Sequence, residues 1–382
     1  MRTVRQHVAR HARPLPSRVC HVSRRGCANS QCVQSCRYIA VRQNRYVTQS
    51  VQLPLLMALS GSRPERLPVW FMRQAGRSLP EYRKARQGVA MLDACLTPEL
   101  AAELTCQPVW RHGVDAAVFF SDIMVPLALA GVDVTIEPGI GPVIAHPVRS
   151  ADDVAALASH RITDGSAITA AVRMAVAELD VPIIGFAGAP FTLAAYLVEG
   201  RGSRDHLAAR SFMHAEPAAW DCLLTWCARI SGEFLRLQAA GGAAAVQLFD
   251  SWAGVLSLQD YMAHAAPYSR LALQAVDVPR IHFGTGTGHL LEAMFECGCQ
   301  ALSIDYRTPL NEAARRVPGA VLQGNIDPAF LAAGWSALEA HTRDVVARGR
   351  NAPAHIVGLG HGVPPQTDPA VLTDLVSLIH EL

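Results

Sequence analysis

The chain has 382 residues, half of them apolar, so it can bury one barrel-sized core or two ordinary ones. No uncharged apolar run approaches the roughly 18 residues that a membrane span needs, and we expect a soluble protein without membrane contact. The ten cysteines are too few for a disulfide scaffold in so long a chain and suit a reducing cytoplasm.

The net charge of +2 hides an uneven distribution. Residues 1–56 hold ten arginines and no acidic residue, which leaves 24 basic and 32 acidic residues in 57–382, a net charge of −8. The larger part is therefore acidic, and we expect no nucleic-acid partner. An anionic ligand would have to be held by a few well-placed arginines.

Residues 1–56 also lack apolar periodicity. Their composition fits a transit peptide, a disordered extension, or upstream sequence joined to a domain that begins at Met57, and we favour the last two. The C-x4-C-x3-C spacing between residues 27 and 36 has no second pair, so it gives little support to a zinc module. We expect a disordered or non-native extension over 1–56 and one domain over 57–382. A chain starting at Met57 should then fold and act as well as the full one.

From Leu67 onward, short apolar runs alternate with longer stretches of helical length. Eight runs are strand-like: Pro68–Gln74, Ala116–Asp122, Val181–Ala189, Ala244–Asp250, Val278–Gly284, Ala301–Tyr306, Ala320–Ile326 and Ala354–Gly360. Alternation of strands and helices indicates parallel strands with right-handed crossovers. Eight such units predict an α/β fold, a single-domain (β/α)8 TIM barrel.

Two further features refine this prediction. Val132–Glu137 and Pro142–His146 flank a Pro-Gly pair and predict a hairpin inserted after the second strand. Pro98–His112 should be a helix, with Thr97 as N-cap and Gly113 just beyond its end. The alternative, an open doubly wound sheet, usually has a Gly-rich phosphate turn after its first strand, and this chain lacks one there.

In a barrel, the chemistry gathers at the carboxyl ends of the strands. The polar or small residues expected there include Arg73, Gln74, Ala75, Gly76, Arg77, Asp122, Tyr196, Ser251, Asp305 and His361. Paired arginines favour a multiply carboxylated ligand, because each guanidinium can hold a carboxylate by two hydrogen bonds. The glycines on both sides of His361 indicate a close approach of the backbone to another group. Each residue alone has an ordinary structural explanation, but together they indicate a binding site.

No cluster of histidine and cysteine with metal-ligand spacing occurs at the predicted strand ends. Cys297-Gly-Cys299 is too tightly spaced for a usual zinc pair and follows a predicted helix. We therefore expect no metal at this site.

Several motifs resemble the uroporphyrinogen decarboxylase family. The longest is PVWFMRQAGRSLPEYR, from Pro68 to Arg83. The others are Phe120–Ile123, Gly185–Thr192, Gln247–Gly254, Leu322–Pro328 and Gly358–Gly362, and the resemblance extends from Met57 to the C-terminus. It implies a (β/α)8 homodimer without metal or organic cofactor. It also implies conversion of the four acetate side chains of uroporphyrinogen III to methyls, giving coproporphyrinogen III in haem biosynthesis.

The resemblance also implies roles for individual residues. The substrate-binding residues would be Arg73, Gln74, Ala75, Gly76, Arg77, Asp122, Tyr196, Ser251 and His361. Asp122 would be the catalytic group, stabilising positive charge on a protonated pyrrole. The chain departs from the family at Ser78 and Tyr306, where Tyr and Trp are usual, and at Gly284, where many members have Lys.

Two other classes of function stay open. A zinc- or corrinoid-type methyltransferase of the same fold would carry a His-x-Cys ligand pair, whereas this chain has Gly284 where that Cys would follow His282. A non-catalytic tetrapyrrole-binding protein would keep the arginines but would not need Asp122.

Overall fold

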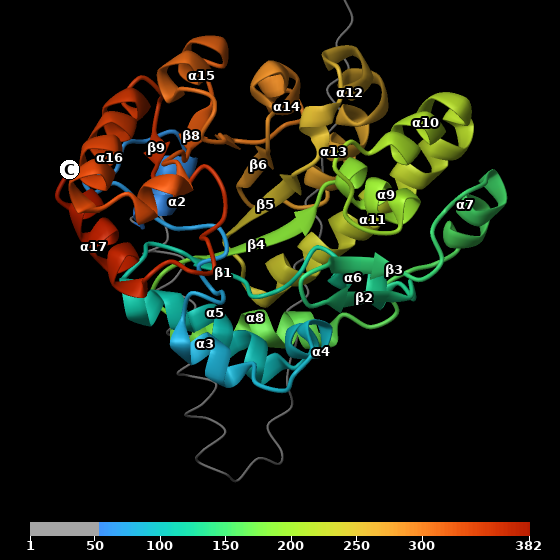
Figure 1. Ribbon diagram of the computed structural model, residues 1–382, viewed down its shortest axis with the longest axis horizontal. Helices are drawn as coiled ribbons and strands as arrows, with labels where there is room; N and C mark the ends of the chain where they lie inside the picture. The colour runs from blue at the N-terminus through green and yellow to red at the C-terminus, as the bar shows by residue number, and fades with distance from the viewer. Residues whose placement is uncertain (1–52) are drawn as a thin grey trace, which may run out of the picture. The chain divides into compact units, whose positions relative to one another are not determined.

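The structure is a computed structural model and describes residues 53–382. Seven parallel strands form one sheet in the order β1-β4-β5-β6-β7-β8-β9, so each strand pairs with the strand of this sheet that follows it in the sequence (Figure 1). The strands are β1 (Ala117–Val118), β4 (Ile183–Gly188), β5 (Ala245–Asp250), β6 (Arg280–Gly284), β7 (Ala301–Ser303), β8 (Val321–Gln323) and β9 (His355–Ile356). The predicted α/β class and parallel pairing are confirmed.

The segment that begins at Pro68 joins the two edges of this sheet. Val69 forms a parallel bridge with Val357, and Val357 N donates to Pro68 O at 2.8 Å. On the other side, Asp115 N donates to Val69 O at 2.8 Å, just before β1. The sheet therefore curls back on itself into a barrel-like form, with its carboxyl strand ends at one mouth.

The predicted first strand, Pro68–Gln74, is reduced to this bridge, so the sheet has seven regular strands where the sequence suggested eight. Two local features explain the difference. Pro68 has no N–H to donate to a ladder. Arg73 has a φ of 61°, which ends extended backbone and starts a turn.

Helices surround the sheet (Figure 1). They are α2 (Pro54–Leu59), α3 (Pro80–Ala85), α4 (Met91–Leu96), α5 (Pro98–His112), α6 (Val125–Leu129), α7 (Ala151–Leu157), α8 (Ser166–Glu178), α9 (Pro190–Glu199), α10 (Leu207–Ala215), α11 (Pro217–Gly241), α12 (Leu258–His264), α13 (Ala266–Leu273), α14 (Leu291–Phe295), α15 (Leu310–Arg316), α16 (Trp335–Gly349) and α17 (Pro369–His380). Helix α5 has the predicted bounds and ends at Gly113 with φ 67°. Over residues 53–382, none of the helices is both long and apolar enough to cross a membrane.

A separate two-stranded antiparallel sheet lies between β1 and β4 in the sequence. It pairs β2 (Val134–Glu137) with β3 (Gly141–Ile144), and Gly139 in the turn has a φ of 80°. Ile144 N donates to Gly200 O at 2.7 Å, which ties the pair to the end of α9.

The interior of the barrel is built in layers. At its amino-terminal end, Leu55 and Leu59 of α2 are buried against a ring of small and branched strand residues: Ala116, Ile184, Ala245, Ile281, Ala301, Val321, Ala354 and Ile356. Helix α2 therefore closes the bottom of the barrel. The domain boundary expected at Met57 falls inside this helix, and the basic segment up to residue 52 lies outside the described residues.

A polar layer lies in the strands above this ring. Gln323 donates to Gln247 Oε1 at 3.0 Å and to Ser303 Oγ at 2.8 Å, and it accepts from Trp70 Nε1 at 3.1 Å. These bonds satisfy the buried Gln323 amide. They leave the chemistry to the residues nearer the mouth.

Candidate active site

The turn after Phe71 places Arg73 at the mouth. Gln74 is fully buried, accepts from Phe71 N at 3.0 Å and donates to Ala116 O at 3.0 Å. Gly76 is required because a Cβ there would stand 2.7 Å from Arg73 O. Both ends of the Gln74 side chain thus hold the turn. This geometry favours a positioning role for the Gln74 side chain, and the expectation that Gln74 also binds substrate stays a prediction.

Asp122 follows β1 and lies partly exposed at the mouth. Its Oδ1 accepts a hydrogen bond from Met124 N at 2.9 Å. Burial raises the pKa of the Asp122 carboxyl, while that hydrogen bond and the positive charge of Arg73 act in the opposite direction. Within residues 53–382, Asp122 Oδ2 accepts no hydrogen bond, so this oxygen is available to a ligand.

Tyr196 on α9 lies near Asp122. Burial, reinforced by the negative charge of Asp122, raises the pKa of the Tyr196 phenol to about 12, so the hydroxyl stays protonated. Its ring stacks on Trp252 with centroids 3.9 Å apart, and Trp252 also stacks on His206 at 4.1 Å. Ser251, next to Trp252 and directly after β5, is partly exposed.

His361 lies on the loop after β9, beside Arg73. A Cβ on Gly362 would stand 2.7 Å from Arg73 Cδ, and a Cβ on Gly360 would collide with the backbone of Tyr306. The two glycines therefore make room for these neighbours, as the sequence suggested. Burial, together with the positive charges of Arg73 and Arg307, lowers the pKa of His361 and keeps its imidazole neutral at physiological pH.

A buried carboxylate stands close to this loop. Asp305, which follows β7, accepts from Arg307 Nη1 at 2.7 Å and also from Gly286 N. The Arg307 guanidinium lies over the Tyr306 ring, 4.4 Å from its centroid. The Asp305 carboxylate is thus paired with the Arg307 guanidinium and the Gly286 N–H. Tyr306 and Arg307 form part of the rim.

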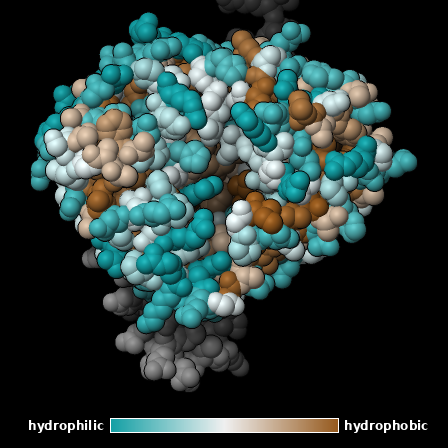
Figure 2. Space-filling view, viewed as in Figure 1, coloured by the Kyte–Doolittle hydropathy of each residue, from teal (hydrophilic) through white to brown (hydrophobic). Residues whose placement is uncertain are grey.

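The floor of the mouth is aromatic. Phe186, Phe249 and Phe283, from three adjacent strands, pack edge to face with centroids 5.3 and 5.7 Å apart. Met72 and Ile123 pack against them. Figure 2 shows a hollow near the centre of this view, with strongly hydrophobic colour in and beside it. An apolar floor under a polar rim suits a flat, ring-shaped ligand with charged arms.

Some of the predicted site residues lie close together, and others lie farther from them. The charge of Arg73 affects the pKa values of Asp122, Tyr196 and His361, so these four residues form the centre of the site. Arg73 and Arg77 are both exposed, but the titrating group that the charge of Arg77 affects is Tyr82. Arg77 therefore lies farther out.

The candidate site residues chosen from the sequence did not include the three phenylalanines, Trp252 or His206, although Phe283 and Trp252 stand at predicted strand ends. In strands buried on both faces, apolar residues run continuously, so the pattern does not tell which of them point inward. Trp252 could have been suspected from its position beside Ser251. Nothing in the sequence placed His206 at the site, because it lies in the segment between α9 and α10 and reaches Trp252 only through the tertiary structure.

The methyltransferase type of zinc site finds no support in this geometry. His282 is fully buried in β6, and its Nδ1 lies 3.3 Å from Met294 O. Gly284 occupies the position at which a cysteine ligand would stand.

Comparison with known proteins shows which family the chain resembles. Residues 52–382 match the family model described as uroporphyrinogen decarboxylase (URO-D). The uroporphyrinogen decarboxylase of an Arthrobacter species is 60% identical over 334 residues, covering 86% of this chain and 97% of the relative. That of Leifsonia xyli is 56% identical over 355 residues, covering 85% and 93%. A methyltransferase from Methanosarcina mazei has a TM-score of 0.71 at 19% identity, covering 87% of this chain and 98% of that one, a likeness of fold.

The fold and its relatives define an enzyme built on an α/β barrel, with its polar groups at the carboxyl ends of the strands. The chain belongs to the uroporphyrinogen decarboxylase family of carboxy-lyases, as its motifs indicated.

Proposed function

We propose that this chain removes the carboxyl groups from the four acetate side chains of uroporphyrinogen III and so produces coproporphyrinogen III for haem and porphyrin biosynthesis. The observation that carries the proposal is the placement of Arg73 beside Asp122 above an aromatic floor, in a chain 60% identical to a named decarboxylase. The floor suits the macrocycle, and the arginine suits its carboxylates.

The reaction needs a sink for the electrons that carbon dioxide leaves behind. Protonation of the pyrrole carbon beside the acetate-bearing carbon gives an iminium-like cation. Cleavage of the bond to the carboxylate then returns its electron pair to the ring and leaves a neutral exocyclic methylene. A second proton on that carbon completes the methyl group, and loss of the first proton from the ring carbon restores the pyrrole, so one proton is taken up for each carbon dioxide released. The ring itself is the sink, so the proposal requires no organic cofactor or metal.

Asp122 is the proposed catalytic residue. Its Oδ2 is free to accept from pyrrole N–H groups while Oδ1 is held by Met124 N. A carboxylate placed there in advance stabilises positive charge as it develops on the pyrrole, which is an electrostatic effect worth several kcal/mol. The low-dielectric surroundings that raise the pKa of Asp122 also strengthen that interaction.

Eight further residues are proposed to bind substrate together with Asp122. Arg73 and Arg77 would bind carboxylates, with Gln74, Ala75 and Gly76 shaping the turn that carries them. Tyr196, Ser251 and His361 would contact further carboxylates or the ring. Tyr196 stays protonated and His361 neutral, so both can donate a hydrogen bond without adding charge.

We further propose a (β/α)8 barrel with the Pro68 segment as its reduced first strand and the β2–β3 pair as an insertion. A cytoplasmic homodimer is proposed as well. Free thiols at all six described cysteines support a reducing compartment, and the exposed apolar residues Leu207, Leu258, Met262 and Leu271 support self-association. Light scattering of the purified chain tests the dimer, which a monomeric mass would contradict.

Incubation with uroporphyrinogen III under reducing, anaerobic conditions tests the function. Chromatography should show products with seven, six, five and finally four carboxyl groups, with heat-treated protein as the blank. A tetrapyrrole carrier would bind the substrate and return it unchanged. A methyltransferase would leave every carboxyl group in place.

A further inference from the structure

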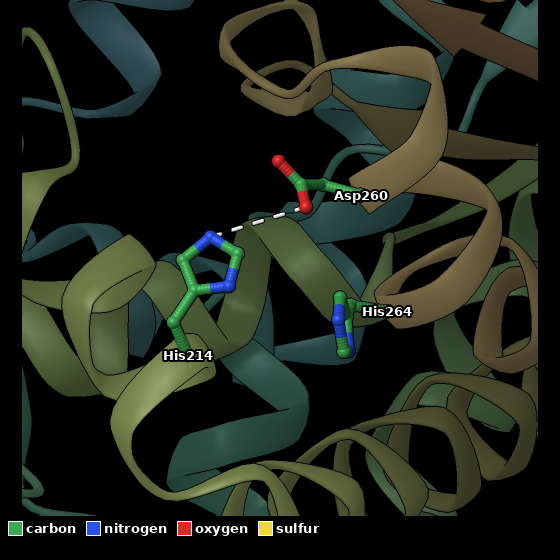
Figure 3. A group of neighbouring side chains, drawn as sticks. All are labelled: His214, Asp260 and His264. Carbon is green, nitrogen blue, oxygen red and sulfur yellow. Dashed lines mark ion pairs between the residues drawn. The ribbon is translucent and has the colours of Figure 1, made fainter.

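Two helices outside the proposed active site bring together a group of metal-binding side chains. His214 lies on α10, and Asp260 and His264 lie on α12 (Figure 3). One ligand atom from each residue can be chosen so that all three atoms lie within 4.8 Å of one another. His214 Nε2 is 3.9 Å from Asp260 Oδ1, and the two imidazole rings stand at 85° with centroids 6.0 Å apart.

The carboxylate in this group is already oriented. Ser257 is the N-cap of α12: its Oγ donates to Asp260 Oδ2 at 2.9 Å and accepts from Asp260 N at 3.0 Å. The other oxygen, Oδ1, is thereby turned toward His214, as Figure 3 shows. His264 stands four residues after Asp260, so both project from the same side of α12. Trp220 Nε1 also donates to His264 O at 3.2 Å, which fixes the end of that helix.

We propose that His214, Asp260 and His264 form a binding site for a divalent late first-row transition ion, of which Zn²⁺ is the natural probe. Two imidazoles and one carboxylate are ligands that zinc accepts, whereas Mg²⁺ and Ca²⁺ prefer all-oxygen sites. With bonds of about 2.0–2.1 Å, opposing ligand atoms would stand no more than about 4 Å apart. The present separations need only small side-chain rotations, and the His214 side chain is 56% exposed and free to make them.

Three protein ligands leave at least one coordination position to water, so the bound ion would remain exchangeable. The site is separate from the group around Asp122 and has no part in the proposed decarboxylation. It departs from the expectation from the sequence, which was that the protein holds no metal and no stoichiometric zinc. That expectation considered metal ligands at the strand ends and could not bring residue 214 next to 260.

The ion would also connect α12 to a helix that leads into the active site. The residue before α10 is His206, whose ring stacks on Trp252 at 4.1 Å, and Trp252 in turn stacks on Tyr196. Ala209 N, in the first turn of α10, donates to Glu199 Oε1 at 3.0 Å. Fixing His214 at the far end of α10 should therefore reduce local opening of the whole helix.

Calorimetric titration of the chelator-stripped full chain with Zn²⁺ tests the site. The double variant His214→Ala/His264→Ala should bind one Zn²⁺ fewer per chain than the unchanged protein. His146→Ala, at an exposed histidine elsewhere, should keep that ion. The N-terminal cysteines are present in every chain, so any zinc that they bind cancels in the comparison. An unchanged number of bound ions, at unchanged affinity, in the double variant would overturn the proposal.

A gentler variant guards against loss of the fold. Asp260→Asn keeps the size of the side chain but removes the charge, and it should weaken zinc binding at this site at least about tenfold with an unchanged circular dichroism spectrum. Hydrogen exchange gives an independent result: Zn²⁺ should slow exchange over residues 207–215 in the unchanged chain and leave it unaltered in the double variant. Equal protection in both proteins would contradict the link between the ion and α10.

Discussion

The positive charge of Arg73 opposes the rise in pKa that burial imposes on Asp122. The two residues come from segments far apart in the sequence, one after the Val69 bridge and the other after β1. Together they place one cationic group for carboxylates and one anionic group for pyrrole N–H groups at the same mouth. This pairing of opposite charges is the basis of the proposed mechanism.

Asp122→Asn should abolish most of the turnover. The amide keeps the shape of the side chain and can still accept from Met124 N, but it cannot stabilise a cation as a carboxylate does. A loss of about 3 kcal/mol of transition-state stabilisation, or a fall in kcat of more than about 100-fold, is expected. Steady-state kinetics together with a denaturation curve check this. A variant within a few-fold of the unchanged enzyme would remove Asp122 from the mechanism.

Lysine substitutions separate the roles of the two arginines. Lysine keeps the positive charge but loses the planar fork, so Arg73→Lys should raise KM by about tenfold, near 1.4 kcal/mol. Arg77→Lys should have a smaller effect because the charge of Arg77 acts on Tyr82, whereas that of Arg73 acts on Asp122, Tyr196 and His361. Both variants keep the positive charge, so a difference between them cannot arise from a loss of charge. Full activity in both variants would mean that neither guanidinium grips a carboxylate.

The stability of the barrel should depend on pH through Asp250. This residue is fully buried and accepts from Thr192 Oγ1 at 3.0 Å, and burial raises its pKa from 3.8 to about 7. Between these two values the folded state holds a proton that the unfolded state releases. The contribution of Asp250 is therefore full below about pH 4 and is lost as pH rises through about 7.

Asp250→Asn removes that contribution and its pH dependence. Urea unfolding should show the variant gaining stability relative to the unchanged chain as pH rises from about 5 to about 8. Buried His282, whose pKa is lowered to about 4, gives the opposite trend, and its Nε2 lies 4.0 Å from Asp250 Oδ2, so the two groups are coupled. The comparison is therefore repeated with His282→Gln in both proteins, which removes the histidine from the difference. A difference that stays constant with pH would show that Asp250 is ionised throughout.

Helix α2 refines the expectation about truncation. A chain starting at Leu53 keeps Leu55 buried at the bottom of the barrel, whereas one starting at Met57 loses it. The shorter chain should unfold at a lower urea concentration, because its free energy of unfolding should be lower by about 2–5 kcal/mol. Leu55→Ala in the full chain should lower the free energy of unfolding by a similar amount. Equal unfolding midpoints for both truncated chains would show that α2 does not close the barrel.

Much of the fold could be predicted from the sequence because the alternation of apolar runs and helical stretches is a local signal. Helix α5 has its predicted bounds because Pro98 and Gly113 fix its two ends. The prediction of a regular first strand was wrong. Pro68 and the turn at Arg73 limit this segment to a single bridge in place of a ladder of hydrogen bonds. The boundary at Met57 was placed by composition, which carries no information on what Leu55 packs against.

The centre of the site was predicted more fully than its surroundings. Arg73, Asp122, Tyr196 and His361 meet because the strand ends converge, and that convergence follows from the barrel itself. The positioning role of Gln74 could not be predicted, because a buried amide and a ligand-binding amide look alike in a sequence. The stack of Trp252 on His206 depends on tertiary packing alone.

The release of carbon dioxide from uroporphyrinogen III labelled in its acetate carboxyls tests the central claim most directly. The account predicts four labelled carbon dioxide molecules for each molecule of substrate consumed to completion by the unchanged enzyme. Over the same period, Asp122→Asn should release less than about one hundredth of that amount. Release of no label by the unchanged enzyme, or equal release by Asp122→Asn, would contradict it.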